Sequence, residues 1–410
     1  MNAAILTIGN ELLGGVVIDS NSAWLARQMA IKGVTVTRKV SVGDVGADII
    51  AMLSALDGEH DLVLITGGLG PTHDDVTKAA LCKYFGSGLT FDEQYWGVLV
   101  ERFSQRGIEI PDNNRSQAEV PDLCEPLPNS VGTALGMKFS SPGTTFIALP
   151  GVPAEMKAII GEHVLPLLGG QSIAEETLRV TGIFESALSE LLEPVITAAK
   201  GVTIGILPRL ISIDLRLQAQ EAGPEGQQAV DAAAQKIKAL LGLKVFASGD
   251  QTLQEVVGAL LIARGETVAL AESCSGGLAA SWLTDVPGIS ACFAGGVVAY
   301  SNAVKQSLVG VSAQSLADHG AVSEEVALEM AVGVRDAMRA TWGISTTGIS
   351  GPSGGSDDKP VGLVYIAVAG KKGTKVREFH LVPRRIDHKQ ATAQAALNML
   401  RLELLNDDSR

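Results

Sequence analysis

The chain has 410 residues, 46% hydrophobic and 19% charged, a composition that suits two or three compact domains and argues against disorder. Its formal net charge of −13 argues against broad binding of nucleic acid or an anionic membrane, since either would require clustered Lys and Arg. The cysteines lie far apart, which indicates neither a zinc ribbon nor a disulfide framework. With no basic signal region at the N-terminus and no long apolar run, a reducing cytoplasm is the expected location.

Short apolar stretches alternate with helical patterns over residues 1–168. Strands are predicted at 3–9, 34–40, 61–68 and 144–151, and helices at 21–33, 47–56, 76–86 and 153–168. This alternation is typical of βαβ units, whose parallel sheets bind ligands at the carboxyl ends of the strands. GNELLGG (Gly9–Gly15) and TGGLGPTHDD (Thr66–Asp75) follow two of these strands and are therefore candidate binding loops.

Two further α/β segments follow a small, polar stretch at 168–174 that is predicted to be a linker. Residues 175–248 form a compact module, with strands at 177–182, 202–207 and 211–219 and helices at 184–195 and 227–242. In residues 250–410, strands are predicted at 266–271, 295–300, 342–348 and 362–370, and helices at 252–265, from 302, at 323–340 and at the C-terminus. The sequence therefore predicts an α/β protein with domains 1–168, 175–248 and 250–410.

The stretch ESCSGG, Glu272–Gly277, lies between a predicted strand and a predicted helix. In a structural interpretation, Ser273 or Ser275 caps the helix and the glycines permit a tight turn. In a chemical one, the turn works with YSNAVK, which ends the next strand and brings Lys305 to the start of another helix. A cation there opposes the helix dipole, so Lys305 is either an exposed, solvated side chain or a catalytic amine with a lowered pKa.

A glycine-rich segment, TGISGPSGGSDDKPVG, follows another predicted strand at residues 347–362. Its glycines and hydroxyl residues suit a loop whose backbone amides surround a phosphate. It lacks the spacing of a P-loop, so ATP hydrolysis is not indicated. A flexible surface loop is the alternative interpretation.

AESCSGG, AYSNAVK, DHGAVSEEVALEMA and TGISGPSGGSDDKPVG together closely resemble the nicotinamide mononucleotide deamidases that form the C-terminal domain of CinA proteins. The resemblance spans nearly all of the third domain. It implies hydrolysis of the carboxamide of nicotinamide mononucleotide to nicotinate mononucleotide and ammonia, with no cofactor. It also implies that Ser273 is the nucleophile, that Lys305 is its base, and that Tyr300 relays or orients the proton.

The same resemblance suggests a substrate-binding set. The amides of Gly276 and Gly277 are expected to stabilise the oxyanion, and Arg385 is expected to bind the 5′-phosphate. The pattern departs from the family at Pro383 and Arg384, which stand for a glycine and an acidic residue, and at Ser275 and Ser350, which stand for threonine and alanine. The glycine-rich loop is expected to hold the phosphate through Thr347, Gly348, Gly351, Gly354 and Gly355.

A rival mechanism uses the same turn. Glu272, Lys305 and Cys274 have the residue types of a nitrilase-like amidase, in which the cysteine thiolate attacks. Glu272 and Cys274 lie on one tight turn, and a cysteine in such a place is more often a small buried hydrophobic residue. Cys274 is therefore the second candidate, after Ser273.

In TGGLGPTHDD the glycines allow a phosphate to approach the backbone, and two aspartates precede a predicted helix. Asp74 and Asp75 either cap that helix or bind a divalent cation that bridges them to phosphate oxygens and polarises the phosphorus. Glu11, in the first loop, is a third candidate carboxylate. His73 is not expected to be a ligand.

This region resembles the molybdopterin-binding-like, Rossmann-like domain at the N-terminus of CinA proteins, through IGNELLGG, DSNSAWLA, VGD, LITGGLGPTHDDVTKAA, NNRSQAEVP, LPNSVGTALGM and ALPGVPAEM. The resemblance implies an ADP-ribose pyrophosphatase that requires a divalent ion (Mg, Mn or Co) and responds to potassium. Asn10 stands where many relatives have aspartate. The implied metal ligands are Asp74, Asp75 and Glu11, and the implied substrate-binding residues are Gly67, Gly68, Gly70 and Thr72.

The middle module resembles the KH-like domain of CinA proteins. Its only G-x-x-G, GPEG at Gly223–Gly226, carries an acidic residue, so it is predicted to start a helix and not to bind RNA. The whole chain is expected to act on nicotinamide mononucleotide and ADP-ribose, to bind neither nucleic acid nor membrane, and by resemblance to form a homodimer. Two alternatives remain: an N-terminal domain that binds nucleotide or molybdopterin without cleaving it, and a non-enzymatic scaffold in DNA uptake.

Overall fold

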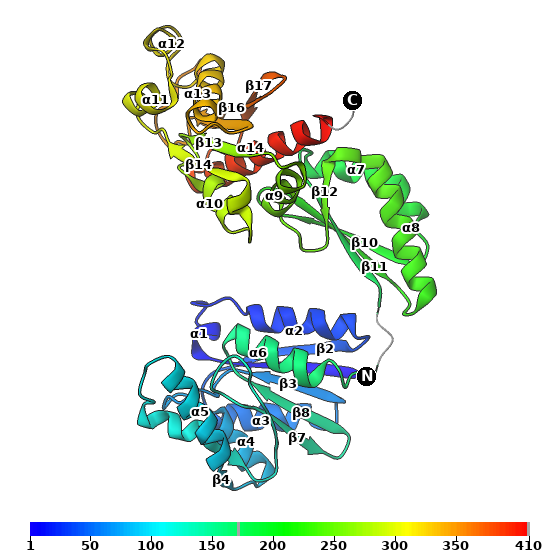
Figure 1. Cartoon of the computed structure of the whole chain (residues 1–410). Helices are drawn as coiled ribbons and strands as arrows, with labels where there is room; N and C mark the ends of the chain where they lie inside the picture. The colour runs from blue at the N-terminus through cyan, green and yellow to red at the C-terminus, as the bar shows by residue number, and fades with distance from the viewer. Residues whose placement is uncertain (170–172, 408–410) are drawn as a thin grey trace. The chain divides into compact units, whose positions relative to one another are not determined.

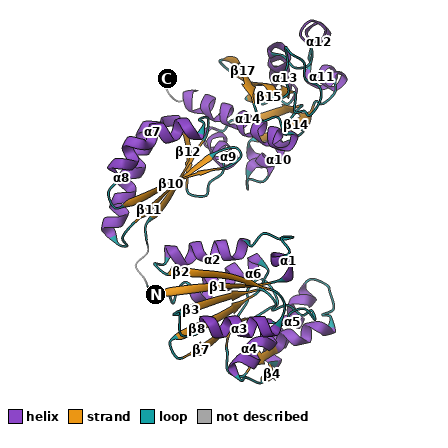
Figure 2. Cartoon of the chain, turned by 180° about the vertical axis from the view of Figure 1, so that it is seen from behind, coloured by secondary structure: helices purple, strands orange, loops and turns teal. Residues whose placement is uncertain are grey.

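The computed structural model describes residues 1–169 and 173–407, so part of the predicted linker lies outside the described residues (Figure 1). The chain forms two compact units, residues 1–174 with 219–227 and residues 175–218 with 228–410. Helices and strands alternate through both units, as the sequence predicts (Figure 2). Within the described ranges no helix is long and apolar enough to cross a membrane.

The N-terminal unit contains a six-stranded sheet in the order β2-β1-β3-β8-β7-β6. β2, β1, β3 and β8 are parallel neighbours, and β7 and β6 add an antiparallel edge. β1 and β3 are buried almost throughout, which explains their nearly continuous apolar sequences. The strands are β1 (Asn2–Ile8), β2 (Thr35–Val42), β3 (Leu62–Thr66), β6 (Glu125–Leu127), β7 (Gly136–Ser141) and β8 (Thr144–Leu149).

Helices cover both faces of this sheet. α2 (Ser20–Ile31) and α6 (Pro153–Ile159) share one apolar core with β1 and β3, whereas α3 (Gly46–Leu56) and α4 (Thr77–Phe85) share a second core on the other face (Figure 1). The remaining elements are α1 (Asn10–Leu13), β4 (Leu89–Phe91), α5 (Glu93–Gln105), the 3-10 helix η1 (Asp112–Ala118), β5 (Glu119–Pro121) and the π-helix η2 (Ile160–Val164).

The middle segment forms a four-stranded sheet in the order β10-β11-β9-β12, with β9 antiparallel to both β11 and β12. The expected helix-start turn is confirmed, because Pro224, Glu225 and Gly226 are the first residues of α8. The elements are β9 (Glu175–Val180), α7 (Glu185–Ala198), β10 (Val202–Pro208), β11 (Ile213–Ala219), α8 (Pro224–Leu241), the 3-10 helix η3 (Gly242–Lys244) and β12 (Val245–Ser248).

The C-terminal part is built on a five-stranded sheet in the order β14-β13-β15-β16-β17. β14, β13 and β15 are parallel, and β16 and β17 continue the sheet in antiparallel fashion. The strands are β13 (Val268–Glu272), β14 (Phe293–Val298), β15 (Trp342–Gly348), β16 (Leu363–Gly370) and β17 (Gly373–His380).

Two helical layers enclose this sheet as well (Figure 1). α9 (Leu253–Arg264), α10 (Leu278–Thr284) and α14 (Arg385–Asp407) share the larger core, and α11 (Asn302–Val309) and α13 (Glu324–Ala337) pack on the other face. The short helices are α12 (Ala313–His319) and the 3-10 helix η4 (Ile289–Ala291).

Each large sheet has a point where the strand order reverses. In the C-terminal sheet the chain runs from β13 outward to β14 and then returns to β15 on the other side of β13. Glu272 at the end of β13 is paired with Val298 of β14 and Thr346 of β15. The loops after these three strands therefore meet at one edge, which is where open α/β sheets bind ligands. In the N-terminal sheet the same reversal lies at β1, between β2 and β3.

Two helical glycines give a test of the packing. Gly333 of α13 leaves no room for a Cβ, which would collide with the Val309 carbonyl, whereas a Cβ at Gly97 of α5 meets nothing within 4 Å. We expect Gly333→Ala to lower the free energy of unfolding by about 1–3 kcal/mol through overpacking. Gly97→Ala is the matched control and is expected to raise it by about 0.5–1 kcal/mol. Calorimetry of the full chain measures both changes, and a gain for Gly333→Ala would contradict this packing.

Candidate functional site

The nucleophile candidate lies on the turn that joins β13 to α10. The Ser273 amide donates to the Thr346 carbonyl of β15 at 2.9 Å, which fixes the start of the turn against the neighbouring strand. Gly276 and Gly277 have φ values of 65° and 88°, a left-handed conformation that favours glycine. The Ser273 side chain is buried at the point where the three parallel strands end.

Glu272, rather than a serine, caps α10. Its carboxylate accepts the amides of Ala279 at 3.2 Å and Ala280 at 2.7 Å, so it satisfies two of the donors that a helix N-terminus leaves free. The expectation that Ser273 or Ser275 provides the cap is therefore wrong. Gly277 holds the N-cap position, and the hydroxyl of Ser275 instead forms a hydrogen bond with that of Thr346 at 2.7 Å.

Lys305 is the most unusual side chain of the site. It is only 1% exposed, and its Nζ donates to Ser273 Oγ at 2.9 Å and to the Ala299 carbonyl at 2.6 Å. Burial lowers the pKa of Lys305 because a desolvated ammonium is costly, and within the described residues no carboxylate contacts it. The amine, not an exposed cation, is the form that the surroundings favour. Ser301 caps α11 by accepting the Val304 amide at 3.3 Å.

Cys274 faces the apolar core between α9, α10 and α14. Burial raises the pKa of its thiol to about 12, so the thiol remains protonated at neutral pH. The expectation of a buried hydrophobic neighbour fits this position. A nitrilase-like mechanism does not, because it requires a thiolate from Cys274 and a free carboxylate from Glu272, and Glu272 is occupied by α10.

Tyr300 and Arg385 meet at the exposed side of the turn. Arg385 donates to the Tyr300 hydroxyl at 2.8 Å and to the Gly351 carbonyl at 2.9 Å. This guanidinium therefore joins the end of β14 to the glycine-rich loop. Tyr300 is 61% exposed, and its hydroxyl accepts a hydrogen bond from Arg385, whereas the sequence grouped Tyr300 with Ser273 and Lys305.

The glycine-rich loop is anchored at several points. Thr347 is buried and donates to the Ala321 carbonyl at 2.6 Å, so its hydroxyl is engaged away from the substrate side. Lys359 binds the carbonyls of His319 at 2.6 Å and Val322 at 2.7 Å. Gly348 and Gly351 lie near the base of the loop, while Gly354 and Gly355 are exposed.

One of the two expected oxyanion donors is engaged. The Gly276 amide donates to the Ser273 carbonyl at 3.1 Å within the turn, which leaves Gly277 as the remaining candidate of the pair. Sequence reasoning also missed Lys389, whose Nζ lies 3.3 Å from the position that a Cβ on Gly276 would occupy. A signal was available, because Lys389 follows Arg385 by four residues and the two share one face of α14.

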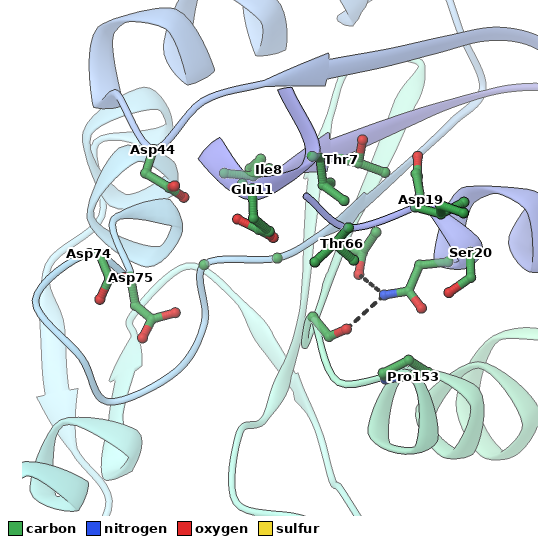
Figure 3. Close-up of a pocket in the computed structure, with 18 residues that line it drawn as sticks. Thr7, Ile8, Glu11, Asp19, Ser20, Asp44, Thr66, Asp74, Asp75 and Pro153 are labelled. Atoms are coloured by element: carbon green, nitrogen blue, oxygen red, sulfur yellow. Dashed lines mark hydrogen bonds between the residues drawn. The ribbon is translucent and has the colours of Figure 1, made fainter. Parts of the chain in front are cut away.

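The N-terminal unit has a pocket of about 320 Å³ where β1 and β3 end (Figure 3). Gly67 and Gly68 form part of its wall, and both have positive φ, at 112° and 66°. A Cβ on either glycine would collide with Ile8 or Thr77, so only glycine fits. The charged residues of the lining are all carboxylates, and they are Glu11, Asp19, Asp44, Asp74 and Asp75.

Three of these carboxylates were expected and two were not. Asp44 follows β2 and accepts the Asn10 amide at 2.8 Å, and Asp19 caps α2 by accepting the Ser22 amide at 2.9 Å. Gly70 and Thr72, the other two residues expected to bind substrate, are not among the residues that line this pocket. A Cβ on Gly70 would come within 2.5 Å of the Asp75 carboxylate.

Asp74 and Asp75 do not cap α4. Val76 occupies the N-cap position, and both carboxylates accept the Thr72 hydroxyl at 2.5 Å. The Thr72 amide also donates to Asp75 at 2.9 Å. The hydrogen bond from the Thr72 hydroxyl lowers the pKa of Asp74, so that carboxylate is charged at neutral pH. Thr72 therefore orients the two carboxylates.

The donor set suits a hard divalent cation, with one correction. Among the described residues, no three His, Cys, Asp or Glu side chains gather closely enough to hold a metal by themselves, so Glu11, Asp74 and Asp75 do not form the expected three-ligand cluster. A magnesium-like ion is commonly held by one or two carboxylates together with phosphate oxygens and water. Asp74 and Asp75 fit that arrangement.

The burial of Lys305 predicts that the free energy of unfolding depends on pH. A folded-state pKa below the unfolded value near 10.4 means that unfolding takes up a proton, so stability is fully present above that value and falls as the pH is lowered toward the folded pKa. We expect the difference in unfolding free energy between Lys305→Met and the wild type to move in favour of the variant as the pH falls from 10.5 to 7, with a slope of up to about 1.4 kcal/mol per pH unit. Denaturant titrations at several pH values measure it, with Lys375→Met as the exposed control. A difference that does not change with pH would contradict the burial.

Three family models match successive parts of the chain: the "Probable molybdopterin binding domain" at 4–170, the "Damage-inducible protein CinA KH domain" at 175–247 and the "CinA C-terminal domain" at 250–404. They confirm the expected fold class.

Relatives extend over the whole length. A CinA-like protein of Anaeromyxobacter sp. (strain Fw109-5) is 40% identical, covering 98% of this chain and 99% of the relative. One of Salinibacter ruber is 39% identical, covering 98% and 100%. A crystal structure of a competence/damage inducible protein of Agrobacterium tumefaciens, 38% identical, covers 38% of this chain and 96% of its own, with a TM-score of 0.36. The chain belongs to the CinA family.

Proposed function

We propose that the C-terminal domain hydrolyses the carboxamide of nicotinamide mononucleotide to nicotinate mononucleotide and ammonia. The observation that carries the proposal is the contact between Lys305 Nζ and Ser273 Oγ at 2.9 Å, made by a lysine whose burial lowers its pKa. A serine hydroxyl is a weak nucleophile by itself and requires a base within hydrogen-bond distance. A neutral lysine amine supplies that base without a histidine.

The reaction follows from these two side chains. Lys305 takes the proton of Ser273 as Oγ attacks the carboxamide carbon, and the carbonyl oxygen becomes an oxyanion beside the Gly277 amide. When the C–N bond breaks, Lys305 returns the proton to the leaving nitrogen, which departs as ammonia. Water then attacks the acyl ester left on Ser273 as Lys305 takes the proton of the water. When the bond between the acyl carbon and Oγ breaks, Lys305 returns that proton to Ser273, and the product carboxylate leaves.

Arg385 supports a mononucleotide as the substrate. Its guanidinium lies between Tyr300 and the Gly351 carbonyl, at the exposed edge of the nucleophile turn, and Lys389 adds a second cation over Gly276. Two cations beside a glycine-rich loop suit a phosphate, because guanidinium and backbone amides are strong phosphate donors. Nicotinamide mononucleotide offers that phosphate and the carboxamide in one molecule.

For the N-terminal domain we propose metal-dependent cleavage of ADP-ribose to AMP and ribose 5-phosphate. Five carboxylates line its pocket, so a pyrophosphate is repelled unless a cation is bound with it. Asp74 and Asp75 would hold that ion, and when bound it polarises the phosphorus for attack by water. Gly67 and Gly68 would let the phosphates approach the backbone, and Glu11 and Asp44 line the same pocket.

A pocket of this kind also fits a domain that binds nucleotide or molybdopterin and cleaves neither. The two functions differ in their products, because only hydrolysis releases AMP. A scaffold without enzymatic activity would release neither AMP nor ammonia.

Mutation distinguishes the two candidate nucleophiles, Ser273 and Cys274. We expect Ser273→Ala to lower the rate of ammonia release from nicotinamide mononucleotide by about 10³-fold or more, because it removes the attacking oxygen. Cys274→Ala should retain most of the activity, since its buried thiol is protonated. A coupled ammonia assay with both variants decides between them. Loss of activity in Cys274→Ala with retention in Ser273→Ala would reverse the assignment.

The N-terminal activity is expected to depend on metal, and the C-terminal one is not. Chelation of divalent ions should abolish AMP release from ADP-ribose and leave ammonia release unchanged. Asp75→Asn should lower AMP release by about 100-fold, as expected when a metal site is disturbed, and Asp122→Asn is the control outside the pocket lining. Chromatographic measurement of AMP at fixed magnesium tests both. AMP release that survives chelation would contradict the metal role.

A further inference from the structure

A buried histidine links α14 to the glycine-rich loop. His388 is fully buried, and its Nδ1 lies 2.9 Å from the hydroxyl of Ser350. Ser350 is also buried, and its hydroxyl contacts the Cys274 carbonyl at 3.4 Å. His388, Ser350 and Cys274 therefore form a line of polar contacts that ends one residue from Ser273.

Two hydroxyls lie beside the Nδ1 of His388. The Ser350 hydroxyl lies 2.9 Å from Nδ1, which is closer than the 3.4 Å between the same hydroxyl and the Cys274 carbonyl. Thr392 donates its proton to the His388 carbonyl at 2.7 Å, and its hydroxyl lies 3.4 Å from Nδ1. Ser350 is therefore the nearer of the two hydroxyl partners of the ring.

Besides Ser350, the ring has a backbone partner at the end of the glycine-rich loop. Burial lowers the pKa of His388, and a hydrogen bond with the backbone of Gly362 opposes that shift. The contact with Ser350 is directional, and it holds a loop that apolar packing alone would leave less restrained.

We propose that His388 is a positioning residue, which acts through Ser350 to hold the base of the glycine-rich loop beside the nucleophile turn. The kinetic part of this inference rests on the proposed deamidase function; the structural part does not. Ser350 precedes Gly351, whose carbonyl accepts from Arg385 at 2.9 Å, so two successive loop residues are held by one end of α14.

The nucleophile turn has its own supports. Ser273 is fixed by Thr346, and Glu272 is fixed by the amides of α10, neither of which involves His388. Loss of the His388 side chain should therefore loosen the glycine-rich loop more than the nucleophile turn. Because the loop is the proposed phosphate site, the expected effect falls on KM and not on kcat.

The first experiment needs no substrate. Amide hydrogen exchange of the full-length protein over residues 349–362 should be about 10-fold faster in His388→Val than in the wild type. Unchanged exchange would overturn the link.

The second experiment is kinetic. We expect His388→Val and Ser350→Ala each to raise KM for nicotinamide mononucleotide about 5- to 10-fold with kcat changed less than about 3-fold, and the double variant to be no worse than either single one. His388→Asn keeps an N–H near the Nδ1 position and should restore KM. Leu400→Ala, a buried change on the same helix, controls for lost stability and should leave KM unchanged.

The outcomes separate the two proposals. Additive effects of the two substitutions, a loss in kcat alone, or no rescue by His388→Asn would overturn the positioning role. If the wild type releases no ammonia, the deamidase function fails, while the exchange measurement still decides whether His388 holds the loop.

Discussion

The C-terminal site depends on an amine kept out of water without a carboxylate to neutralise it. The Nζ of Lys305 forms hydrogen bonds with two neutral oxygens, the hydroxyl of Ser273 and the carbonyl of Ala299. Transfer of a lone ammonium into such a place is expensive, so the surroundings favour the neutral base. The tight turn, the short helix α11 and the fully buried β13 all serve to place this amine at the end of a strand. A carboxylate at the same distance would stabilise the ammonium and keep the amine protonated.

Both large sheets place chemistry at the point where the strand order reverses. At that point the loops after adjacent parallel strands diverge to opposite faces, which leaves room between them. The N-terminal unit fills this room with carboxylates and glycines, and the C-terminal one with a serine, a lysine and an arginine. One architectural rule thus serves two opposite electrostatic environments in one chain, which is consistent with a division of the chain into two proposed activities.

The sequence predicted the fold well because alternating apolar and helical patterns are local signals. It also grouped Ser273 with Lys305, since both follow neighbouring strands of one parallel sheet. It failed where partners are distant or ambiguous in sequence. The cap of α10 comes from Glu272, which lies before a turn and not at the N-cap. The hydroxyl of Thr347 donates to the carbonyl of Ala321, which lies in a loop 26 residues earlier in the chain. Asp44 could not be assigned to the pocket until β2 was placed beside β1.

The capping role of Glu272 has an electrostatic consequence. A carboxylate immediately before the nucleophile would ordinarily raise the basicity of any nearby amine and attract its proton. Here the negative charge is directed at two helix amides, 2.7 and 3.2 Å away, and is screened by the positive end of α10. The helix therefore compensates part of the charge of Glu272 beside the nucleophile turn, and a short helix of seven residues has an electrostatic role as well as a structural one.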